Sequence, residues 1–429
     1  MATTTTEPAE PTASGGFALD EERPSVYSSL RASVLGTGGD MGARPAIAGL
    51  IALFLLFGLG ADKFASKANF ANLITQSTWV IILAVGVTFV LLLGEIDLSA
   101  GYTAGVCVVT IAWLMYQHNV SPWIAIPVGF IIGAAIGTLT GFLVAKVGIP
   151  AFVATLAFFL AWQGVVLQIA REGGTIPINN VLIIALVNKN LSPALGWVLW
   201  AIVVLGYLGM ALSRARGRAK AGLAAEPIVS IGIKAAALAA AWGAGTYILN
   251  DNRSFAGAIR KLDGVPIAVP VVLGTVVVLH LMLSRTTWGR HVYAVGGNTE
   301  AARRAGINVV WVKMSCFIMC GVVACLAGMA LGSQLNSVSP QTGGNDTLLR
   351  AVGAAAIGGV SLFGGRGKLL YPVVGGLVVA TIDNGLGLMG KVGPVDFTQS
   401  GPKFIVQGIV LLLAASVDAL SRKRAGAMV

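Results

Sequence analysis

The sequence predicts an all-helical protein that crosses a membrane many times. Its 429 residues are 56% hydrophobic and only 11% charged, whereas an average soluble protein is about 45–50% apolar and about 25% charged. The mean hydropathy is +0.82, and long apolar runs recur from residue 45 to residue 420. A soluble protein of this size needs surface charge to stay dispersed, so a soluble fold is excluded.

Composition excludes several other classes as well. The 56 glycines have no triplet period, which excludes collagen, and four cysteines are too few for a disulfide scaffold. The net charge of +11 does not indicate a nucleic-acid partner, because membrane proteins collect Lys and Arg in their cytoplasmic loops. The cysteines form no metal-binding cluster with the three histidines and are expected to be small buried hydrophobic residues; they are Cys107, Cys316, Cys320 and Cys325.

The chain begins with a segment of different composition. Residues 1–44 are rich in Thr, Pro, Ala, Ser and Gly and contain no secretory signal. They are predicted to form a disordered cytoplasmic tail. Residues 45–420 are predicted to form a transmembrane domain, and residues 421–429 a basic cytoplasmic tail.

A helix that crosses about 30 Å of hydrocarbon needs about 20 mostly apolar residues. Twelve segments are candidates, and because re-entrant segments imitate short spans, the prediction is about 10–12 transmembrane helices. Lys234 in one of them is expected to pair or to reach the membrane surface, and Arg350 in another is expected to reach outward. The segments are 45–61, 72–93, 99–117, 122–145, 150–170, 195–212, 223–249, 265–283, 309–332, 347–363, 369–388 and 403–419.

The basic residues predict the orientation of these spans. With both termini inside, the inside segments hold 18 of the 29 Lys and Arg residues and the outside loops hold nine. The run of four bases from Arg214 to Lys220 contains no acid, which is typical of a cytoplasmic loop. Both termini are therefore predicted to be cytoplasmic.

Glycine spacing predicts close helix packing rather than nucleotide binding. Gly129, Gly133, Gly137 and Gly141 recur at every fourth residue, so they share one helix face and let two backbones approach. The GLGLMG run at 385–390 ends an apolar span and has no preceding strand, and residues 364–369 lack the spacing of a phosphate loop. If ATP drives this protein, another chain binds the ATP.

The segment 284–313 contains the signals of a short helix with both ends capped. A helix this short is marginal in water, and its alanines, Ala301 and Ala302, suit a groove on a partner protein. A plain topological loop with a solvated basic face is the alternative. The signals are a turn at Gly296 and Gly297, an N-cap at Asn298, an acid in the first turn at Glu300, bases in the last turn at Arg303 and Arg304, and a terminal Gly306.

Polar residues within or between the spans are candidates for a transport pathway, because such residues are costly at membrane depth. Asp97 has an alternative role, which is to cap the next helix by accepting the N–H of Ser99 or Ala100. The candidates are Glu95, Asp97 and Ser99 between two spans, Trp162, Gln163 and Gln168 in 150–170, and Asp383 and Asn384 in 369–388.

Several stretches resemble one known family, the ABC importer permeases for monosaccharides. The run GRHVYAVGGNTEAARRAGINV resembles their coupling-helix segment, GEIDLSAG resembles their signature after the second span, and AAAIGGVSLFGGRG resembles a glycine-rich segment of theirs. The run ATIDNGLGLMG is similar to one in xylose permeases. These blocks follow the family's order between residues 94 and 420, although Glu95 stands where Gly is commoner.

The resemblance implies a permease subunit, not an enzyme, that imports D-xylose or a related pentose by alternating access in a bacterial cell membrane. It implies a second permease subunit, two ATP-binding subunits and an extracytoplasmic sugar-binding protein as partners. ATP and magnesium would be bound by the partners, and no cofactor or metal by this chain. The segment from Gly296 to Gly306 would be the coupling helix that enters the ATPase. Apart from the resemblance, Asp383 and Asn384 end their span, where they are candidates to meet sugar hydroxyls at the outer mouth.

Other assignments remain open at this point. Ribose, galactose, nucleoside and branched-chain amino acid permeases share the implied architecture. An ion-coupled secondary transporter would need paired acids in its spans, which are few here. A facilitative channel would equilibrate its substrate without concentrating it.

Overall fold

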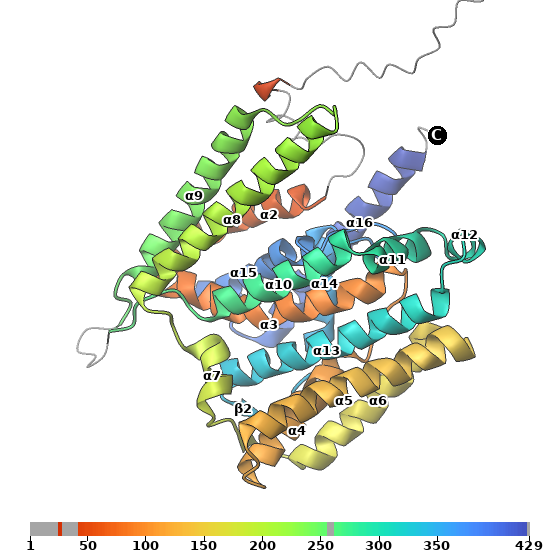
Figure 1. Cartoon of the computed structure of the whole chain (residues 1–429). Helices are drawn as coiled ribbons and strands as arrows, with labels where there is room; N and C mark the ends of the chain where they lie inside the picture. Colours follow the sequence, from red (N-terminus) through yellow and green to blue (C-terminus); the bar gives the residue numbers. More distant parts are fainter. Residues whose placement is uncertain (1–24, 28–41, 255–260, 427–429) are drawn as a thin grey trace, which may run out of the picture. The chain divides into compact units, whose positions relative to one another are not determined.

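The computed structural model of the chain describes residues 25–27, 42–254 and 261–426 (Figure 1). Their regular structure is almost wholly helical, and two short antiparallel ribbons pair β1 with β2 and β3 with β4. This confirms the predicted all-helical class. The predicted tail of residues 1–44 lies outside the described residues at all but a few positions, as do the last three residues of the predicted tail 421–429.

A helix overlaps each of the twelve predicted spans, and α7 and α11 are two further helices that lie outside those spans. The helices are α2 Arg44–Gly60, α3 Lys67–Leu92, α4 Ala100–Tyr116, α5 Pro122–Phe142, α6 Ala151–Ala170, α7 Val181–Asn188, α8 Pro193–Lys220, α9 Ile228–Asn250, α10 Ala268–Arg285, α11 Thr287–Gly297, α12 Thr299–Arg304, α13 Val309–Leu335, α14 Asn345–Gly358, α15 Tyr371–Met389 and α16 Ser400–Gly426. The π-helical turn η1 (Leu143–Val147) extends α5, and the strands are β1 Ile176–Pro177, β2 Ser337–Val338, β3 Lys391–Val392 and β4 Val395–Asp396.

The described residues form two compact units. The smaller unit includes residues 201–241, which are the later part of α8, the earlier part of α9 and their connection. Within it, Lys234 Nζ lies 2.5 Å from Glu226 Oε1, which confirms that Lys234 pairs. The larger unit includes residues 42–200 and 242–426, and every candidate site residue belongs to it.

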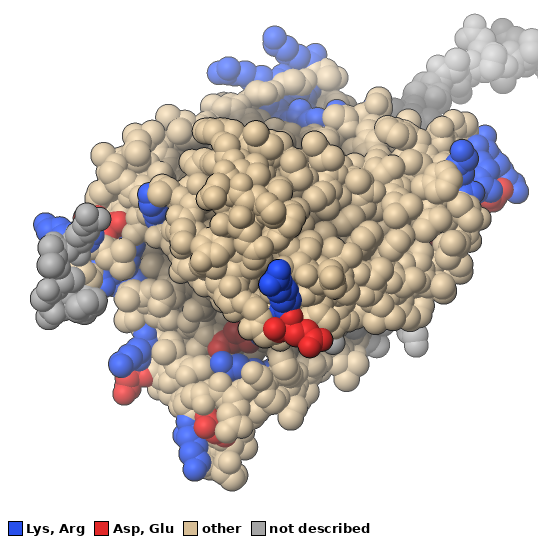
Figure 2. All heavy atoms as spheres, turned by 90° about the horizontal axis from the view of Figure 1, so that it is seen from below, with Lys and Arg blue, Asp and Glu red and all other residues tan. Residues whose placement is uncertain are grey.

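Eight of the described helices are long and apolar enough to cross a membrane. Three apolar stretches are shorter, and the predicted range of 10–12 is reached only when these are counted; they are Arg44–Gly60, Ala100–Tyr116 and Ser400–Leu413. Figure 2 shows broad areas of described surface without charged side chains, with acids and bases gathered in a few small groups. Such a surface is typical of helices that border lipid.

The core of the larger unit surrounds α3. Every residue from Ser77 to Leu92 is buried, which is the pattern of a helix enclosed by other helices. The helix packs against α10, α13, α14 and α15 (Figure 1). All four cysteines are buried, as expected, with Cys316 and Cys320 on α13 in this same core.

The four glycines spaced along one face of α5 allow α5 to pack closely against α13. A Cβ at Gly133 would lie 2.5 Å from the Gly321 carbonyl oxygen, and a Cβ at Gly137 would lie 2.4 Å from the Phe317 carbonyl oxygen. Real Cβ atoms do not approach backbone oxygens so closely. The predicted role of these glycines in packing is therefore confirmed, and the partner is α13 of the same chain.

The predicted span 347–363 is shorter in the structure. The helix α14 ends at Gly358 because Gly359 adopts a left-handed conformation with φ of +104°. Its N–H and that of Val360 return to the carbonyls of the last helical turn, which is a common way to end a helix. The chain from residue 359 to residue 370 is non-helical apart from turns, and it becomes part of the candidate site.

The α5–α13 contact generates a first prediction. We expect Gly133→Ala to lower the free energy of unfolding by about 1–3 kcal/mol, because the new methyl group forces two backbones apart. Thermal unfolding of the purified protein in detergent measures this. The control is Gly164→Ala on α6, where a Cβ meets no atom within 4 Å and helix propensity is expected to raise stability by about 0.5–1 kcal/mol. Equal behaviour of the two variants would contradict the packing role.

Candidate functional site

The short helix α12 is built as the sequence predicts. The Asn298 side-chain oxygen accepts a hydrogen bond from the Ala301 N–H at 2.9 Å, which caps the first turn. At the other end, Gly306 has φ of +81°, and the N–H groups of Gly306 and Ile307 donate to the carbonyls of Arg303 and Ala302. The last turn is thereby closed on itself.

The charged side chains of α12 are exposed and interact mainly with one another. Arg303 Nη1 lies 3.0 Å from Glu300 Oε2, and Arg304 Nε lies 4.0 Å from Glu300 Oε1. All three side chains are more than half exposed, whereas Ala302 is buried against the rest of the loop. One face of α12 therefore holds it to the protein, and the opposite face presents charge and Ala301 to the outside.

The predicted turn at Gly296 and Gly297 is corrected by the structure. Both residues form the last turn of α11, and the chain changes direction at Asn298, whose backbone is extended. Gly296 is required for another reason. A Cβ there would lie 1.8 Å from the carbonyl oxygen of Leu92 at the end of α3, so only glycine permits this approach.

Three separate stretches meet at this point, and we name the meeting place the glycine junction: residues 92–94, 296–297 and 364–367. The Gly365 N–H donates to the Leu92 carbonyl at 2.8 Å, and a Cβ at Gly364 would lie 2.6 Å from the Gly94 nitrogen. The GEIDLSAG run, the glycine-rich AAAIGGVSLFGGRG run and the predicted coupling segment are therefore in direct main-chain contact.

Tyr293 on α11 secures the junction from the side. Its hydroxyl donates to the Gly367 carbonyl at 2.7 Å. Burial raises the pKa of Tyr293 to about 12, so the hydroxyl keeps its proton and remains a donor at physiological pH. The Trp288 Nε1–H donates to Ser315 Oγ at 2.7 Å, which fastens the start of α11 to α13.

The linker between α3 and α4 holds three of the predicted pathway residues. Asp97 is 5% exposed, and its Oδ1 accepts from the Ser99 N–H at 2.9 Å and from Ser99 Oγ at 2.6 Å. The Asp97 oxygen thus accepts the Ser99 N–H, as one alternative predicted, and forms a turn directly before α4, whose N-cap is Ser99. Glu95 Oε1 lies 2.5 Å from Lys313 Nζ at the start of α13, and both side chains are mostly buried. The linker is therefore attached to the segment that follows α12.

A second polar group lies at the other end of α3, near the end of α15 and the starts of α14 and α16. Arg350 on α14 pairs with Asp383 on α15, and Asp383 also accepts from the Gln407 side chain of α16. The expectation that Arg350 reaches outward is wrong, because its side chain is only 20% exposed. A buried guanidinium is retained only beside an acid, and Asp383 supplies that acid.

Hydrogen bonds between amides extend this group to α3. The Asn69 amide donates to Asn384 Oδ1 at 2.9 Å, and the Asn384 amide donates to Gln76 Oε1 at 3.2 Å. The predicted residues Asp383 and Asn384 are therefore brought together with Arg350, Asn69 and Gln76, which the sequence analysis missed. The available signal was the presence of Asn and Gln in otherwise apolar helices.

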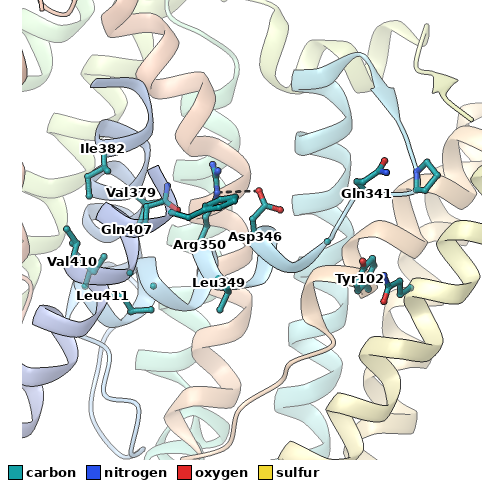
Figure 3. Close-up of a pocket in the computed structure, with 17 residues that line it drawn as sticks. Tyr102, Gln341, Asp346, Leu349, Arg350, Val379, Ile382, Gln407, Val410 and Leu411 are labelled. Atoms are coloured by element: carbon teal, nitrogen blue, oxygen red, sulfur yellow. Dashed lines mark ion pairs between the residues drawn. The ribbon is translucent and has the colours of Figure 1, made fainter. Parts of the chain in front are cut away.

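Two cavities open beside these residues. The cavity that we name the amide cavity has a volume of about 490 Å³, and its lining includes Asn69, Gln76, Arg350, Asp383 and Asn384. The larger cavity has a volume of about 650 Å³ (Figure 3). In Figure 3, Arg350 and Asp346 lie between Tyr102 and Gln341 on one side and the α15 and α16 residues on the other. Both volumes are in the range of small-molecule sites.

The remaining candidates on α6 have different surroundings. Gln163 lines the larger cavity. Trp162 stacks on Phe158, with ring centroids 5.4 Å apart, and its buried Nε1–H has no partner among the described residues. Gln168 is exposed and is not part of the lining of either cavity. The structure therefore brings only Gln163 of the three close to the second polar group.

The Glu95–Lys313 pair generates a second prediction. We expect Lys313→Met to lower the free energy of unfolding by about 1–3 kcal/mol, because the mostly buried Glu95 carboxylate loses its partner. The reversed pair, Glu95→Lys with Lys313→Glu, is expected to recover most of that loss. Thermal unfolding of the purified protein is the measurement.

The matched control for this prediction is Lys67→Met, which breaks the Lys67–Asp251 pair. Both of those side chains are about half exposed, so solvent replaces the interaction and little change is expected. If Lys313→Met unfolded at the temperature of the unaltered protein, the pair would have no role in holding the linker.

Residues 69–415 match the family described as branched-chain amino acid transport system / permease component. The xylose transport system permease protein of Escherichia coli K12 is 32% identical over 92% of this chain and 98% of its own length. That of Haemophilus influenzae is 34% identical over 88% and 96%, and the ribose import permease protein of Escherichia coli K12 is 30% identical over 86% and 92%.

No solved structure matches the chain. The family match covers well over half of the sequence, and the relatives align along nearly their whole length. Together with the apolar helices, this makes the chain a multi-pass protein of the inner membrane. The chain belongs to the family of ABC transporter permeases that includes these xylose and ribose permeases.

Proposed function

We propose that the chain is the membrane-spanning subunit of an ATP-driven importer for a monosaccharide, with D-xylose or a related pentose as the substrate. The xylose permeases among the relatives support this substrate, and the ribose permease supports the wider class. The family description names branched-chain amino acids, so an amino acid is the alternative solute that an experiment must exclude.

The observation that carries the proposal is the construction of α12. It is a helix of six residues, capped at both ends, whose exposed face presents Ala301 and the charges of Glu300, Arg303 and Arg304. A helix this short does not persist by itself in water. Here its two caps and the packing of Ala302 hold it in place with its charged face exposed. Such a surface suits a groove on a partner, and in this family of transporters the partner is an ATP-binding subunit.

The glycine junction supports a route from α12 into the membrane domain. In the proposed mechanism, two ATP-binding subunits close on ATP and magnesium and draw together the α12 helices of two permease subunits. Because α11 touches Leu92 and Gly365 through main-chain atoms, a displacement of α11 must move the end of α3 and the loop after α14. The pathway then changes the side of the membrane to which it opens. An extracytoplasmic binding protein would deliver the sugar on the outer side.

This arrangement places α12 and both termini in the cytoplasm, in line with the distribution of Lys and Arg. The amide cavity then lies toward the outer side, because α3 runs from it to the junction. The chain itself contributes the pathway and the coupling helix, and the partners contribute ATP hydrolysis.

The substrate is tested with the complete transporter reconstituted in proteoliposomes with its ATP-binding subunit and binding protein. We expect ATP-dependent accumulation of labelled xylose, with weaker accumulation of ribose and galactose and none of leucine. Uptake is expected to continue in the presence of an uncoupler of ion gradients. Accumulation of xylose by the permease alone, or its collapse with the uncoupler, would replace the proposal with a secondary transporter.

The role of α12 is tested by reversing its charges. We expect Glu300→Lys with Arg303→Glu to weaken docking of the ATP-binding subunit by on the order of 100-fold, because like charges facing each other in an interface cost several kcal/mol. Sugar uptake should fall in parallel, while membrane insertion persists. Co-purification and uptake are the two measurements.

The control for the charge reversal is Lys67→Glu with Asp251→Lys, an exposed ion pair in which the same reversal also leaves the net charge unchanged. Lys67 begins α3, at the end opposite the glycine junction, so docking should be unchanged. Normal uptake in the α12 variant would remove the assignment of α12 as the coupling helix.

A further inference from the structure

The lining of the amide cavity has the chemistry of a site for a neutral polyhydroxy solute. It combines amide side chains, which offer donors and acceptors in one plane, with the ring of Trp79. Each sugar hydroxyl both donates and accepts, so amides and paired charges suit it better than a single charge does. The amide side chains in the lining are Asn69, Asn72, Gln76, Gln334 and Asn384.

The charges around the two cavities balance. Arg350 and Lys403 are matched by Asp383 and Asp346 among the described lining residues. Arg350 pairs with Asp383, and its Nε lies 3.6 Å from Asp346 Oδ2. With no excess of either sign, the site gives no advantage to an ion. A neutral solute can exchange hydrogen bonds with the pair without leaving a charge uncompensated.

The lining of the amide cavity also contains a side chain with an unsatisfied hydrogen-bonding atom. The Oε1 atom of Gln334 is buried and has no hydrogen-bond partner in the described part of the chain, and Gln334 lines the amide cavity. The Nε atom of Arg350 is also buried without a hydrogen bond, although it lies in an ion pair with Asp346. Leaving the Gln334 oxygen without a hydrogen bond costs about 1–3 kcal/mol, so a ligand that donates to it gains affinity.

Arg350 stands between the two cavities, since it contributes to the lining of both, as does Phe404. Its pairing with Asp383 and the bond from Gln407 to Asp383 link α14, α15 and α16. The pair therefore lies where the linings of the amide cavity and the larger cavity meet.

We propose that the amide cavity is a binding station for a neutral monosaccharide within the permease, at which the Arg350–Asp383 pair binds sugar hydroxyls and separates this cavity from the larger one. The direction of passage rests on the proposed function, whereas the binding chemistry does not. The pair thereby makes the permease itself selective, in addition to the binding protein.

The first experiment replaces the pair by apolar residues of similar size, Arg350→Met with Asp383→Leu. Such replacement of a buried ion pair is commonly neutral or favourable for stability, so the protein is expected to fold. In the complete transporter in proteoliposomes, we expect kcat/KM for xylose uptake to fall by at least about tenfold. The control is Lys67→Gln with Asp251→Asn, an exposed pair for which uptake should be unaltered.

The second experiment uses Gln334→Leu. If Gln334 were purely structural, removing its unpaired buried oxygen would stabilise the protein and leave uptake unchanged. The proposal instead expects thermal stability to be kept or raised while the KM for xylose rises by about tenfold. This variant keeps the test decisive if the double variant fails to fold.

The outcomes separate the two proposals. If the unaltered complex accumulates no monosaccharide, the proposed function fails. If it accumulates xylose but Gln334→Leu and the folded double variant do so with unchanged kinetics, the binding station is overturned. Stronger competition by leucine than by unlabelled xylose would also overturn it, since it would assign the cavity to a zwitterion.

Discussion

Main-chain contact at the glycine junction is the constraint around which the larger unit is arranged. Three stretches that are far apart in the sequence approach so closely that any side chain at Gly296 or Gly364 would overlap backbone atoms. Contacts of this kind cannot be adjusted by changing a rotamer, because packed interiors have no free volume to absorb a shift. A displacement of one stretch must therefore displace the other two, so the glycine junction couples the movements of α3, α11 and the loop after α14.

The charged pairs inside the larger unit have a related meaning. Glu95 with Lys313 and Arg350 with Asp383 are mostly buried, and pairs in such surroundings add little net stability because both charges lose water. They do, however, fix which segments lie together, since breaking either pair leaves an uncompensated charge. The Glu95–Lys313 pair lies beside the glycine junction, and the Arg350–Asp383 pair lies beside the cavities. The two pairs therefore fix the relative positions of helices at the two places on which the proposed transport mechanism depends.

The sequence predicted the twelve long helices and the short helix α12 because both depend on local signals. The length of an apolar run predicts a span. The start and end of α12 are indicated within a few residues by Asn298, Glu300 and Gly306. Long-range contacts left no such signal. Nothing near Arg350 in the sequence indicates Asp383, which is 33 residues away, and Gly296 suits a turn as well as a close contact. The amide side chains of α3 were visible but had no known partners until Asn384 was placed beside them.

The glycine junction and the cavities are joined by α3, whose amide side chains, Asn69, Asn72 and Gln76, all lie at the end beside the cavities. The helix rises about 24 Å from Gln76 to Leu92, and every residue in that stretch from Ser77 onward is buried. A helix enclosed on all sides moves as a rigid element together with its neighbours. A displacement at Leu92 therefore reaches Gln76 and Asn69 with little loss. If α3 and α15 touched at this end through apolar side chains alone, a small shift would change their contact little. Their hydrogen bonds through Asn384 are directional, so the same shift must break them or change their partners. In the proposed mechanism, that exchange converts a small movement of the junction into a change of affinity at the cavity.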